Sequence, residues 1–255
     1  MRILVTNDDG VRADGIRHLA HVASEFGEVK IVAPDRERSA CAHAMTLRDP
    51  LRVNETCVDG IEAFEVNGLP VDCVNVGLTV AWPDGCDLVL SGINNGPNLG
   101  FDVTYSGTVA GAMEGTVLGI PSFALSQAYA FTTKHNPYWE TAIKHAPDLI
   151  KRVLKAGMPR DVLVNVNFPD CQPEQVAGVA VTVQGKRDQE LLRIDGRHDG
   201  RGNPYYWIAF TRGGVSGAAQ GSDLAALMEN RISVTPLRLD LTDEPFMTTL
   251  AEVFD

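Results

Sequence analysis

Basic residues are scarce in this chain relative to acidic ones. There are 22 Lys and Arg against 33 Asp and Glu, a formal net charge of −11. A broad nucleic-acid-binding surface needs clustered Lys and Arg to neutralise phosphates, so binding of a nucleic-acid polymer is disfavoured. A small anionic ligand stays compatible with this charge, because a bound cation can reverse the local field. A phosphate ligand would therefore imply a metal ion.

Cysteine is also sparse, and its spacing excludes two classes of small domain. No Cys-x-x-Cys pair occurs and the number of cysteines is odd, so neither a zinc knuckle nor a disulfide framework is supported. We expect reduced, mostly buried thiols. The five cysteines are Cys41, Cys57, Cys73, Cys86 and Cys171.

Long hydrophobic runs are missing. No apolar stretch approaches the roughly 18 residues that a membrane span needs, and no charged segment followed by an apolar one stands at the start of the chain. We therefore expect a cytoplasmic protein without a membrane partner.

Several nucleotide and hydrolase motifs are absent. The chain has no Gly-x-Gly-x-x-Gly after its first strand, no Gly-x-x-x-x-Gly-Lys-Ser/Thr and no Asp-x-Asp pair. Residues 214–218 resemble a nucleophile elbow but lack its second glycine. A dinucleotide fold, a P-loop enzyme and a serine hydrolase are thus unsupported.

The first half of the chain alternates strand and helix patterns. Ile3 to Val5 is a short apolar run, and apolar residues then recur at helical spacing from Ile16 to Phe26. Asp14 is the expected N-cap of that helix and Gly27 its stop. A second apolar strand follows at 29–33, and strand, helix, strand predicts a βαβ unit with a parallel sheet.

The remaining elements follow the same pattern until about Pro169, with one insertion. Two strands, 51–57 and 61–66, flank Asp59-Gly60 and predict a hairpin. Helices are expected at 70–78, 107–118 and 142–154, and strands at 88–90, 122–125, 162–166, 179–183, 205–210 and 232–239. We predict one α/β domain over residues 1–255, with a Rossmann-like three-layer core, a mainly parallel sheet and a β-rich C-terminal extension.

An acidic loop, Asn7-Asp8-Asp9-Gly10, follows the first strand. Ligands of open parallel sheets bind beyond the carboxyl ends of strands. Two like charges about 4 Å apart repel by about 4 kcal/mol at an effective dielectric of about 20. Solvent screens them, one is protonated, or a cation lies between them. Gly10 permits the bent backbone that convergence of neighbouring side chains needs.

Further polar clusters follow other strands. Arg38-Ser39 comes after the second, and the run from Ser91 to Gly100 comes after the strand at 88–90. Asp, Ser and Asn supply hard oxygens, which suit Mg²⁺, Mn²⁺ or Ca²⁺ better than zinc. Tyr105 to Thr108 opens a helix, whose free amides form an anion site. Taken singly, each cluster is also compatible with an ordinary turn, loop or N-cap.

Four motifs together resemble the SurE (survival protein E) family. In order they are MRILVTNDDG, APDRERSA, SGINNGPNLG and YSGTVAGAMEG, and GNPYYWI and ISVTPLRLDLT resemble later landmarks of that family. The resemblance extends over essentially the whole chain. It implies a metal-dependent 5'-nucleotidase, or acid phosphatase, that acts on nucleoside monophosphates, with 3'-monophosphates and short polyphosphate as further substrates.

The resemblance also implies a set of site residues and one divalent cation per subunit, Mg²⁺ or Mn²⁺ first and Co²⁺ or Ca²⁺ as alternatives. The implied catalytic residues are Asp8 and Asp9. The implied metal ligands are Asp8, Asp9, Ser39 and Asn94, and the implied phosphate-binding residues are Asn98, Ser106, Gly107 and Thr108. After Ser39 the family usually has Gly-Ala-Ser, whereas this chain has Ala40-Cys41-Ala42 and then His43.

The chemical roles stay open at this point. Asp8 is the first candidate for a nucleophile or a water-activating base, and Asp9 is the first candidate for a metal ligand. Direct attack by water and a phospho-aspartyl intermediate are both compatible with the sequence. One alternative is a non-catalytic nucleotide- or metal-sensing protein that uses the same pocket. Another is a structural subunit whose acidic loop is merely solvated.

The last third of the chain predicts self-association. The segment from Lys186 to Ser222 is rich in Gly and charge yet carries Tyr205-Tyr206-Trp207-Ile208 and Phe210. Tyr and Trp are enriched at interfaces. We predict an oligomerisation arm and C-terminal extension at 186–245 and a homodimer or homotetramer, in line with the arms of SurE-like proteins. An ordinary strand of the main sheet is the alternative.

Overall fold

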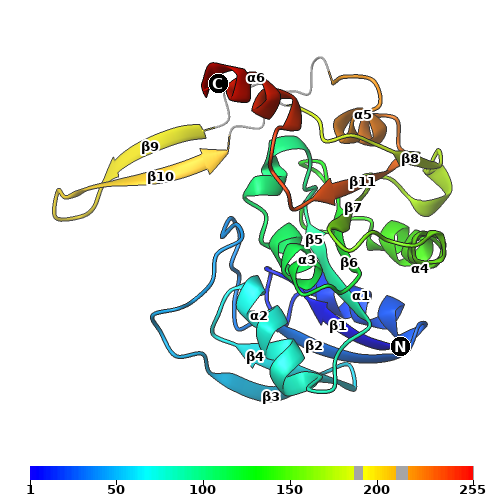
Figure 1. The fold of residues 1–255 in the computed structure, drawn as a ribbon. Coiled ribbons are helices and arrows are strands. Elements are labelled where there is room, and N and C mark those ends of the chain that lie inside the picture. Colours follow the sequence, from blue (N-terminus) through cyan, green and yellow to red (C-terminus); the bar gives the residue numbers. More distant parts are fainter. Residues whose placement is uncertain (187–191, 211–217, 255) are drawn as a thin grey trace.

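A computed structural model describes residues 1–186, 192–210 and 218–254 of the chain. Its centre is a nine-stranded sheet with strand order β3-β4-β2-β1-β5-β6-β7-β11-β8 (Figure 1). Every neighbouring pair is parallel except β3 with β4 and β11 with β7. The predicted α/β fold with a mainly parallel sheet is confirmed.

The strands of this sheet are β1 (Arg2–Thr6), β2 (Glu28–Pro34), β3 (Val53–Val58), β4 (Ile61–Val66), β5 (Leu88–Asn95), β6 (Ser122–Gln127), β7 (Val162–Phe168), β8 (Val179–Val181) and β11 (Ile232–Arg238). The helices are α1 (Asp14–Ser24), α2 (Pro70–Val76), α3 (Gly107–Val117), α4 (Trp139–Ala156), α5 (Asp223–Met228) and α6 (Glu244–Phe254). A π-helical turn spans Gly77–Ala81, and 3₁₀ turns span Gly100–Thr104 and Pro173–Gln175.

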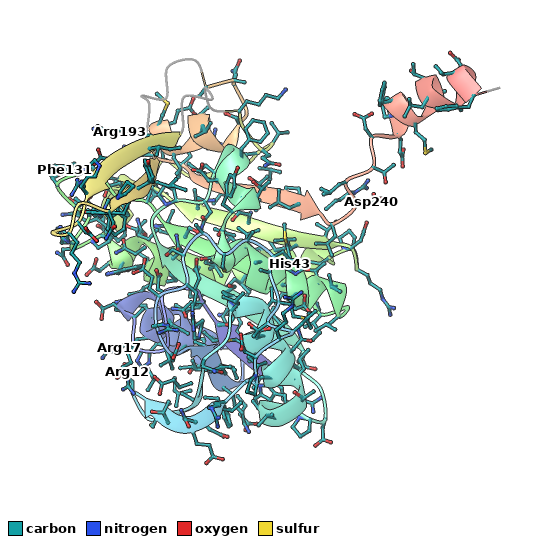
Figure 2. The ribbon with its side chains drawn as sticks, turned by 90° about the vertical axis from the view of Figure 1, so that its left-hand side faces the viewer. Arg12, Arg17, His43, Phe131, Arg193 and Asp240 are labelled. Atoms are coloured by element: carbon teal, nitrogen blue, oxygen red, sulfur yellow. The ribbon has the colours of Figure 1, made fainter. Side chains whose placement is uncertain are left out.

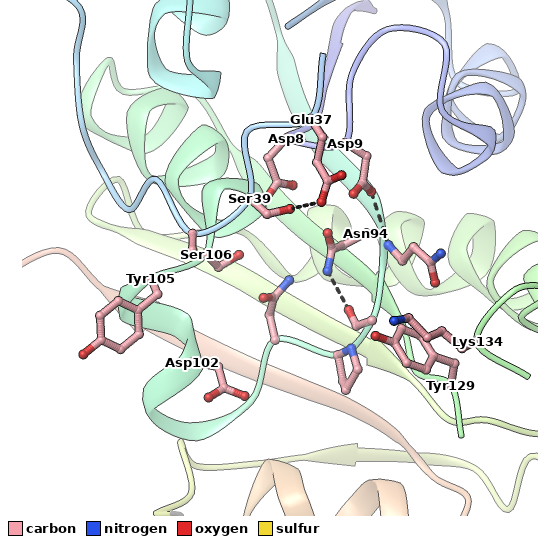
Figure 3. A pocket seen from close by; sticks show the side chains of 15 residues that line it. Asp8, Asp9, Glu37, Ser39, Asn94, Asp102, Tyr105, Ser106, Tyr129 and Lys134 are labelled. Carbon is pink, nitrogen blue, oxygen red and sulfur yellow. Dashed lines mark hydrogen bonds between the residues drawn. The ribbon is translucent and has the colours of Figure 1, made fainter. Parts of the chain in front are cut away.

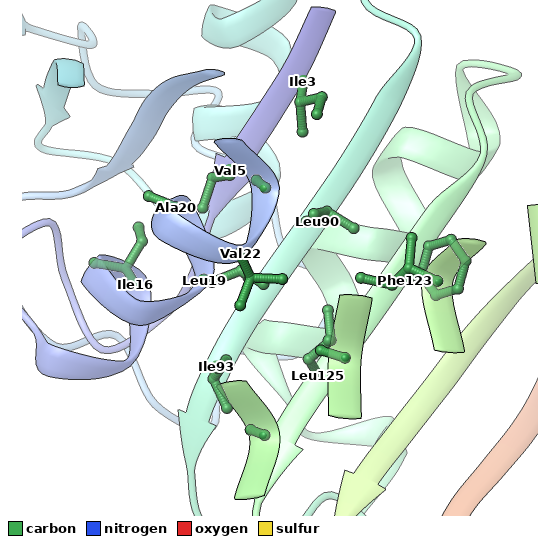
Figure 4. Packing of buried hydrophobic residues seen from close by; sticks show 14 of the residues in the cluster. Ile3, Val5, Ile16, Leu19, Ala20, Val22, Leu90, Ile93, Phe123 and Leu125 are labelled. Carbon is green, nitrogen blue, oxygen red and sulfur yellow. The ribbon is translucent and has the colours of Figure 1, made fainter. Parts of the chain in front are cut away.

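Helices cover both faces of the sheet, which gives the three predicted layers. Along β1, Ile3 and Val5 belong to one apolar cluster and Leu4 to another, as the two-residue period of a strand requires. The first cluster contains Ile16 and Leu19 of α1 (Figure 4) and residues of α4; the second contains residues of α2. Burial on both faces explains why these strands read as continuous apolar runs.

Two expectations about element ends need correction. Asp14 is the first residue of α1 and not its N-cap; Ala13 takes that position without a side-chain hydrogen bond. The strand expected at 88–90 continues to Asn95, so Asn94 lies in β5 after an irregularity in the pairing between Ser91 and Asn94. The hairpin around Asp59-Gly60 is confirmed.

The C-terminal part divides into strands that join the main sheet and a hairpin that does not. β8 and β11 complete the large sheet, whereas β9 (Leu192–His198) and β10 (Pro204–Phe210) form a separate antiparallel pair that projects from the body (Figure 1). The prediction of a strand at 205–210 is confirmed; β9, α5 and α6 were not predicted. Residues 187–191 and 211–217, hence parts of the predicted arm and most of the elbow-like 214–218 motif, lie outside the described residues.

The hairpin and α6 are exposed. Tyr206, Trp207 and Ile208 are 67%, 60% and 69% exposed. No residue of α6 is buried, and beyond Asp240 this helix extends away from the sheet (Figure 2). Within the ranges that the structure describes, no helix is long and apolar enough to cross a membrane.

Candidate active site

The loop after β1 is shaped by Asn7 and Gly10. Asn7 Oδ1 accepts from the Gly10 amide at 3.1 Å, and Asn7 Nδ2 donates to the Gly10 carbonyl at 3.0 Å. Gly10 has φ of +104°, a conformation that residues with a Cβ rarely adopt. This tight loop holds Asp8 and Asp9 at the carboxyl end of β1, as predicted.

Asp8 lies against the first turn of α3. Thr108 Oγ1 donates a hydrogen bond to Asp8 Oδ1. A Cβ added to Gly107 would lie 2.7 Å from the Asp8 Cβ and 2.9 Å from its Oδ2, so only glycine permits this approach. Asp8 is 4% exposed. Burial raises the pKa of Asp8, and the Thr108 hydrogen bond opposes this rise.

Asp9 lies on the other side of the loop. Its Oδ2 accepts from the Asn95 amide at 3.3 Å. Burial, followed by the charge of Asp8, raises the pKa of Asp9 to about 7. Glu37 adds to the rise at both aspartates. Without a cation, full ionisation of these carboxylates is therefore unfavourable. A divalent cation bound between them would offset their repulsion and stabilise the ionised forms.

Ser39 reaches the same place from the segment after β2. The Arg38 amide donates to the Asp8 carbonyl at 2.7 Å, which joins that segment to the acidic loop. Ser39 Oγ donates to Glu37 Oε1 at 2.9 Å. Both side chains face Asp8 and Asp9 in Figure 3.

Asn94 and Asn98 come from the end of β5 and the loop behind it. Asn94 Nδ2 donates to the Gly96 carbonyl at 2.7 Å, and Figure 3 shows its amide oxygen turned toward Ser39 and the aspartates. The Asn98 amide donates to Asn167 Oδ1 at 2.8 Å, and Asn98 Nδ2 donates to Ser126 Oγ at 2.8 Å. Asn98 is therefore fixed by the ends of two neighbouring strands, β6 and β7.

The N-terminus of α3 forms one wall. Ser106 is the N-cap, and its Oγ accepts from the Val109 amide at 3.1 Å. Its hydroxyl hydrogen stays available to a ligand, and so does the Gly107 amide, which as the first helical residue has no partner within the helix. The Thr108 hydroxyl donates to Asp8 Oδ1, and the Thr108 backbone amide also interacts with the Asp8 carboxylate.

These groups surround one pocket of about 440 Å³. Six predicted residues line it: Asp8, Asp9, Ser39, Asn94, Asn98 and Ser106. Gly107 and Thr108 do not, but both contact Asp8. Nine further residues line the pocket and were not predicted as site residues. They are Glu37, Ala40, Asn95, Gly96, Pro97, Asp102, Tyr105, Tyr129 and Lys134.

The donor set fits a hard divalent cation. Carboxylate, hydroxyl and carboxamide oxygens converge from Asp8, Asp9, Ser39 and Asn94, and such oxygens suit Mg²⁺, Mn²⁺ or Ca²⁺. In the described part of the chain, no group of three or more His, Cys, Asp and Glu side chains is placed to hold a metal. The oxygen set at this pocket contains two carboxylates, those of Asp8 and Asp9, beside a hydroxyl and a carboxamide.

The C-terminal part supports the pocket from behind. Asp223, at the start of α5, is fully buried. Its Oδ2 accepts from the Gly100 amide at 2.8 Å and its Oδ1 from the Gly185 amide at 2.9 Å. The loop that carries Asn98 is thereby tied to residues more than eighty positions further along the chain.

Comparison with known proteins places this architecture in a family. The family model "Survival protein SurE" matches residues 3–191. The chain is 54% identical to the 5'-nucleotidase SurE of Azorhizobium caulinodans, over 100% of this chain and 99% of that protein. It is 53% identical to the 5'-nucleotidase SurE of Methylobacterium nodulans, with 100% of both covered.

A solved structure agrees with these relatives. The crystal structure of the SurE protein from Aquifex aeolicus is 41% identical and superposes with a TM-score of 0.83, covering 99% of each chain. Fold and site define an α/β protein with an oxygen-rich acidic pocket at the carboxyl edge of a parallel sheet. The chain belongs to the SurE family, and the resemblance seen in its motifs is confirmed.

Proposed function

We propose that the protein is a metal-dependent phosphomonoesterase that hydrolyses nucleoside 5'-monophosphates to nucleoside and phosphate. The observation that carries this proposal is the contact of Asp8 with the first turn of α3. It places a buried carboxylate beside amides and a hydroxyl suited to a phosphate. The names of the relatives, 5'-nucleotidase SurE, support the same substrate class.

The phosphate would bind at the start of α3. The Ser106 hydroxyl and the Gly107 amide can donate to its oxygens, and the helix dipole favours the negative charge. Thr108, whose hydroxyl and amide interact with Asp8, lies beside them. Asn98, held rigidly by Asn167 and Ser126, lies in the same pocket. Donors fixed in this way can stabilise charge that develops on the phosphoryl oxygens without reorganisation.

Asp8, Asp9, Ser39 and Asn94 would hold the metal ion, Mg²⁺ or Mn²⁺ in the first place and Co²⁺ or Ca²⁺ as alternatives. When bound, the ion polarises phosphoryl oxygens and neutralises developing charge. Its charge also favours ionised Asp8 and Asp9, whose pKa values burial otherwise raises. Asp8 has one oxygen fixed by Thr108, which orients the other for attack on phosphorus or for removal of a proton from water.

The outer part of the pocket would receive the nucleoside. Tyr105 and Tyr129 line it and offer aromatic faces to a base. Lys134 is the one cation among the described lining residues and lies beside Tyr129 (Figure 3). It would attract the anionic substrate, and 3'-monophosphates and short polyphosphate are further substrates within this proposal.

A nucleotide-sensing protein without turnover is the alternative from another class. Release of phosphate from AMP by pure protein with Mn²⁺ or Mg²⁺ distinguishes the two. An enzyme releases phosphate in proportion to time and protein concentration and stops when EDTA removes the metal. A sensor binds AMP without releasing phosphate, a result that would overturn the proposed activity.

We also propose that the enzyme is a cytoplasmic homodimer or homotetramer that assembles through the predicted 186–245 arm. The exposed aromatic residues of the β9–β10 hairpin support this, because such surface is typical of interfaces. Part of the same range, β11, belongs to the main sheet. The β9–β10 hairpin pairs with no strand of that sheet, so among the described residues of the arm it is available to contact a partner.

A further inference from the structure

The segment that carries Ser39 needs contacts from outside itself. Residues 35–52 contain neither helix nor strand. Ala40 and Ala42 have φ of 58° and 51°, a left-handed conformation that residues with a Cβ adopt at a cost. A backbone of this kind persists only where its surroundings fix it.

Three hydrogen bonds donated by backbone amides of this segment supply part of that support. The Arg38 amide donates to the Asp8 carbonyl at 2.7 Å, as described above, and the Ala42 amide donates to the Tyr105 carbonyl at 3.0 Å. Further along, the Thr46 amide donates to Asp72 Oδ1 at 2.9 Å. The segment thus runs past the acidic loop and the start of α3 before it reaches α2.

A side-chain contact completes the attachment. His43 Nε2 lies 3.0 Å from Glu114 Oε2, and the other carboxylate oxygen of Glu114 accepts from Asn75 Nδ2 at 2.7 Å. A carboxylate only accepts, so Nε2 carries the hydrogen in this pair. Glu114 belongs to α3, seven residues or about two turns after Gly107.

The burial of this pair is asymmetric. The Glu114 side chain is 7% exposed and that of His43 is 39% exposed. A buried carboxylate is stable only if its hydrogen bonds are made, so Glu114 selects the position of the segment in which His43 reaches it. His43 does not line the pocket, and its effect must act through the residues between it and Ser39.

We infer that His43, paired with a Glu114 carboxylate that Asn75 also binds, is a positioning residue that fixes the Ser39 segment on α3. In this way it sets Ser39 against Asp8 and Asp9. The expected effect of His43 on cation binding rests on the proposed function, in which Ser39 is a metal ligand. The attachment of the Ser39 segment to α3 rests only on the contacts described above. His43 directly follows Ala40-Cys41-Ala42, the three residues where this chain departs from the usual family sequence.

Cys41 provides a probe that needs no metal. Its Sγ would lie 2.9 Å from a Cβ built on Gly107, so the thiol packs on the same helix turn as Asp8. Burial raises the pKa of the Cys41 thiol to about 11. Release of the segment exposes this thiol, and its rate of alkylation then rises.

The test compares His43→Ala and His43→Gln with His21→Ala. His21, on α1, is the matched control, because its Nε2 lies 3.1 Å from Oδ2 of Asp59 in the β3–β4 turn, and His21 does not line the pocket. Cys41 alkylation is followed by peptide mass spectrometry in metal-free protein, and Mn²⁺ binding by calorimetry. We expect about fivefold to tenfold faster alkylation and about fivefold to tenfold weaker Mn²⁺ binding in His43→Ala. His43→Gln keeps a hydrogen-bond donor, so its alkylation rate and its Mn²⁺ affinity should both lie between those of His43→Ala and wild type. His21→Ala should change neither the alkylation rate nor the Mn²⁺ affinity.

Unchanged Cys41 alkylation in His43→Ala would overturn the inference, and so would faster alkylation with unchanged Mn²⁺ affinity. A wild-type protein that binds no Mn²⁺ would instead contradict the proposed metal site. The alkylation rates would still decide whether His43 holds the segment.

Discussion

The Thr108 hydroxyl donates its hydrogen to Oδ1 of Asp8, across a separation of 100 residues in the chain. This bond joins the end of β1 to the start of α3, the two elements that supply the carboxylate and the anion-binding amides. It fixes one carboxylate oxygen, Oδ1, while the other, Oδ2, lies against Gly107, where an added Cβ would be 2.9 Å away. The proposed chemistry depends on that orientation.

Thr108→Val tests the orientation directly. Valine keeps the shape of the side chain but cannot donate, so Asp8 loses a hydrogen bond to its charged form. We expect kcat for AMP to fall roughly 10-fold to 100-fold, since such bonds contribute about 1.5–3 kcal/mol. Thr116→Val is the control: Thr116 lies in the same helix, is also buried, and its hydroxyl donates to the Ala112 carbonyl. An equal loss in both variants would mean that the effect comes from the helix and not from Asp8.

Gly107→Ala should displace Asp8. The new Cβ would lie 2.7 Å from the Asp8 Cβ and 2.9 Å from the Cys41 sulfur, so one of them must move. Because a misplacement of about 1 Å can cost about 10²-fold in rate, we expect kcat/KM for AMP to fall at least that far. Gly200→Ala, where no atom lies within 4 Å, should leave activity unchanged. Wild-type activity in Gly107→Ala would contradict the close contact.

The stability of the metal-free protein should depend on Asp9. Its pKa is raised from 3.8 to about 7, so the folded state favours the protonated form. The contribution of protonated Asp9 to the free energy of unfolding is complete below about pH 4 and is lost as the pH rises through about 7. At about 1.4 kcal/mol per pKa unit, the loss is on the order of a few kcal/mol.

Urea unfolding in EDTA at pH 5 and pH 8 measures this effect. The asparagine side chain of Asp9→Asn cannot ionise. The free energy of unfolding of this variant, relative to that of wild type, should therefore rise from pH 5 to pH 8. Asp84→Asn, an exposed aspartate before β5, should show no such rise. A constant difference between Asp9→Asn and wild type would mean that Asp9 is ionised throughout, against the assigned pKa.

Trp207→Ala should weaken assembly. Trp207 lies in β10 and is 60% exposed in the single chain, so a partner subunit can bury it. We expect light scattering at micromolar concentration to detect a larger monomer fraction, with little change in kcat because the pocket does not include this residue. Phe131→Ala, an aromatic residue that is 96% exposed outside the arm, is the control. A fully active wild-type monomer would refute the oligomer.

The local parts of the site could be predicted from the sequence. Asp8 and Asp9 follow an apolar strand, and Ser106 precedes a helix of small residues, so strand-end and helix-start rules place both. Asp14 was misassigned because Ala13 occupies the cap position without any side-chain bond. Residues next to a helix start are easily shifted by one position.

Contacts between distant elements could not be predicted in this way. Tyr129 and Lys134 lie in a loop after β6 without periodicity or motif, and only the order of strands brings them to the pocket. His43 gains a partner only because α3 places Glu114 under its loop. Likewise, no residue of α6 is buried, so no core pattern marks this helix. Its start does carry a cap, because Asp243 Oδ1 accepts from the Phe246 amide at 2.9 Å.

The central claim is that Asp8 carries out metal-dependent phosphate release from a nucleoside monophosphate. The most direct measurement is phosphate release from AMP by wild type, Asp8→Asn and Asp84→Asn with Mn²⁺, and again after EDTA treatment. We predict that wild type and Asp84→Asn release phosphate only with metal, and that Asp8→Asn is slower by at least about 100-fold while it stays folded. Near-wild-type release by Asp8→Asn, or full turnover by exhaustively chelated wild type, would contradict the account.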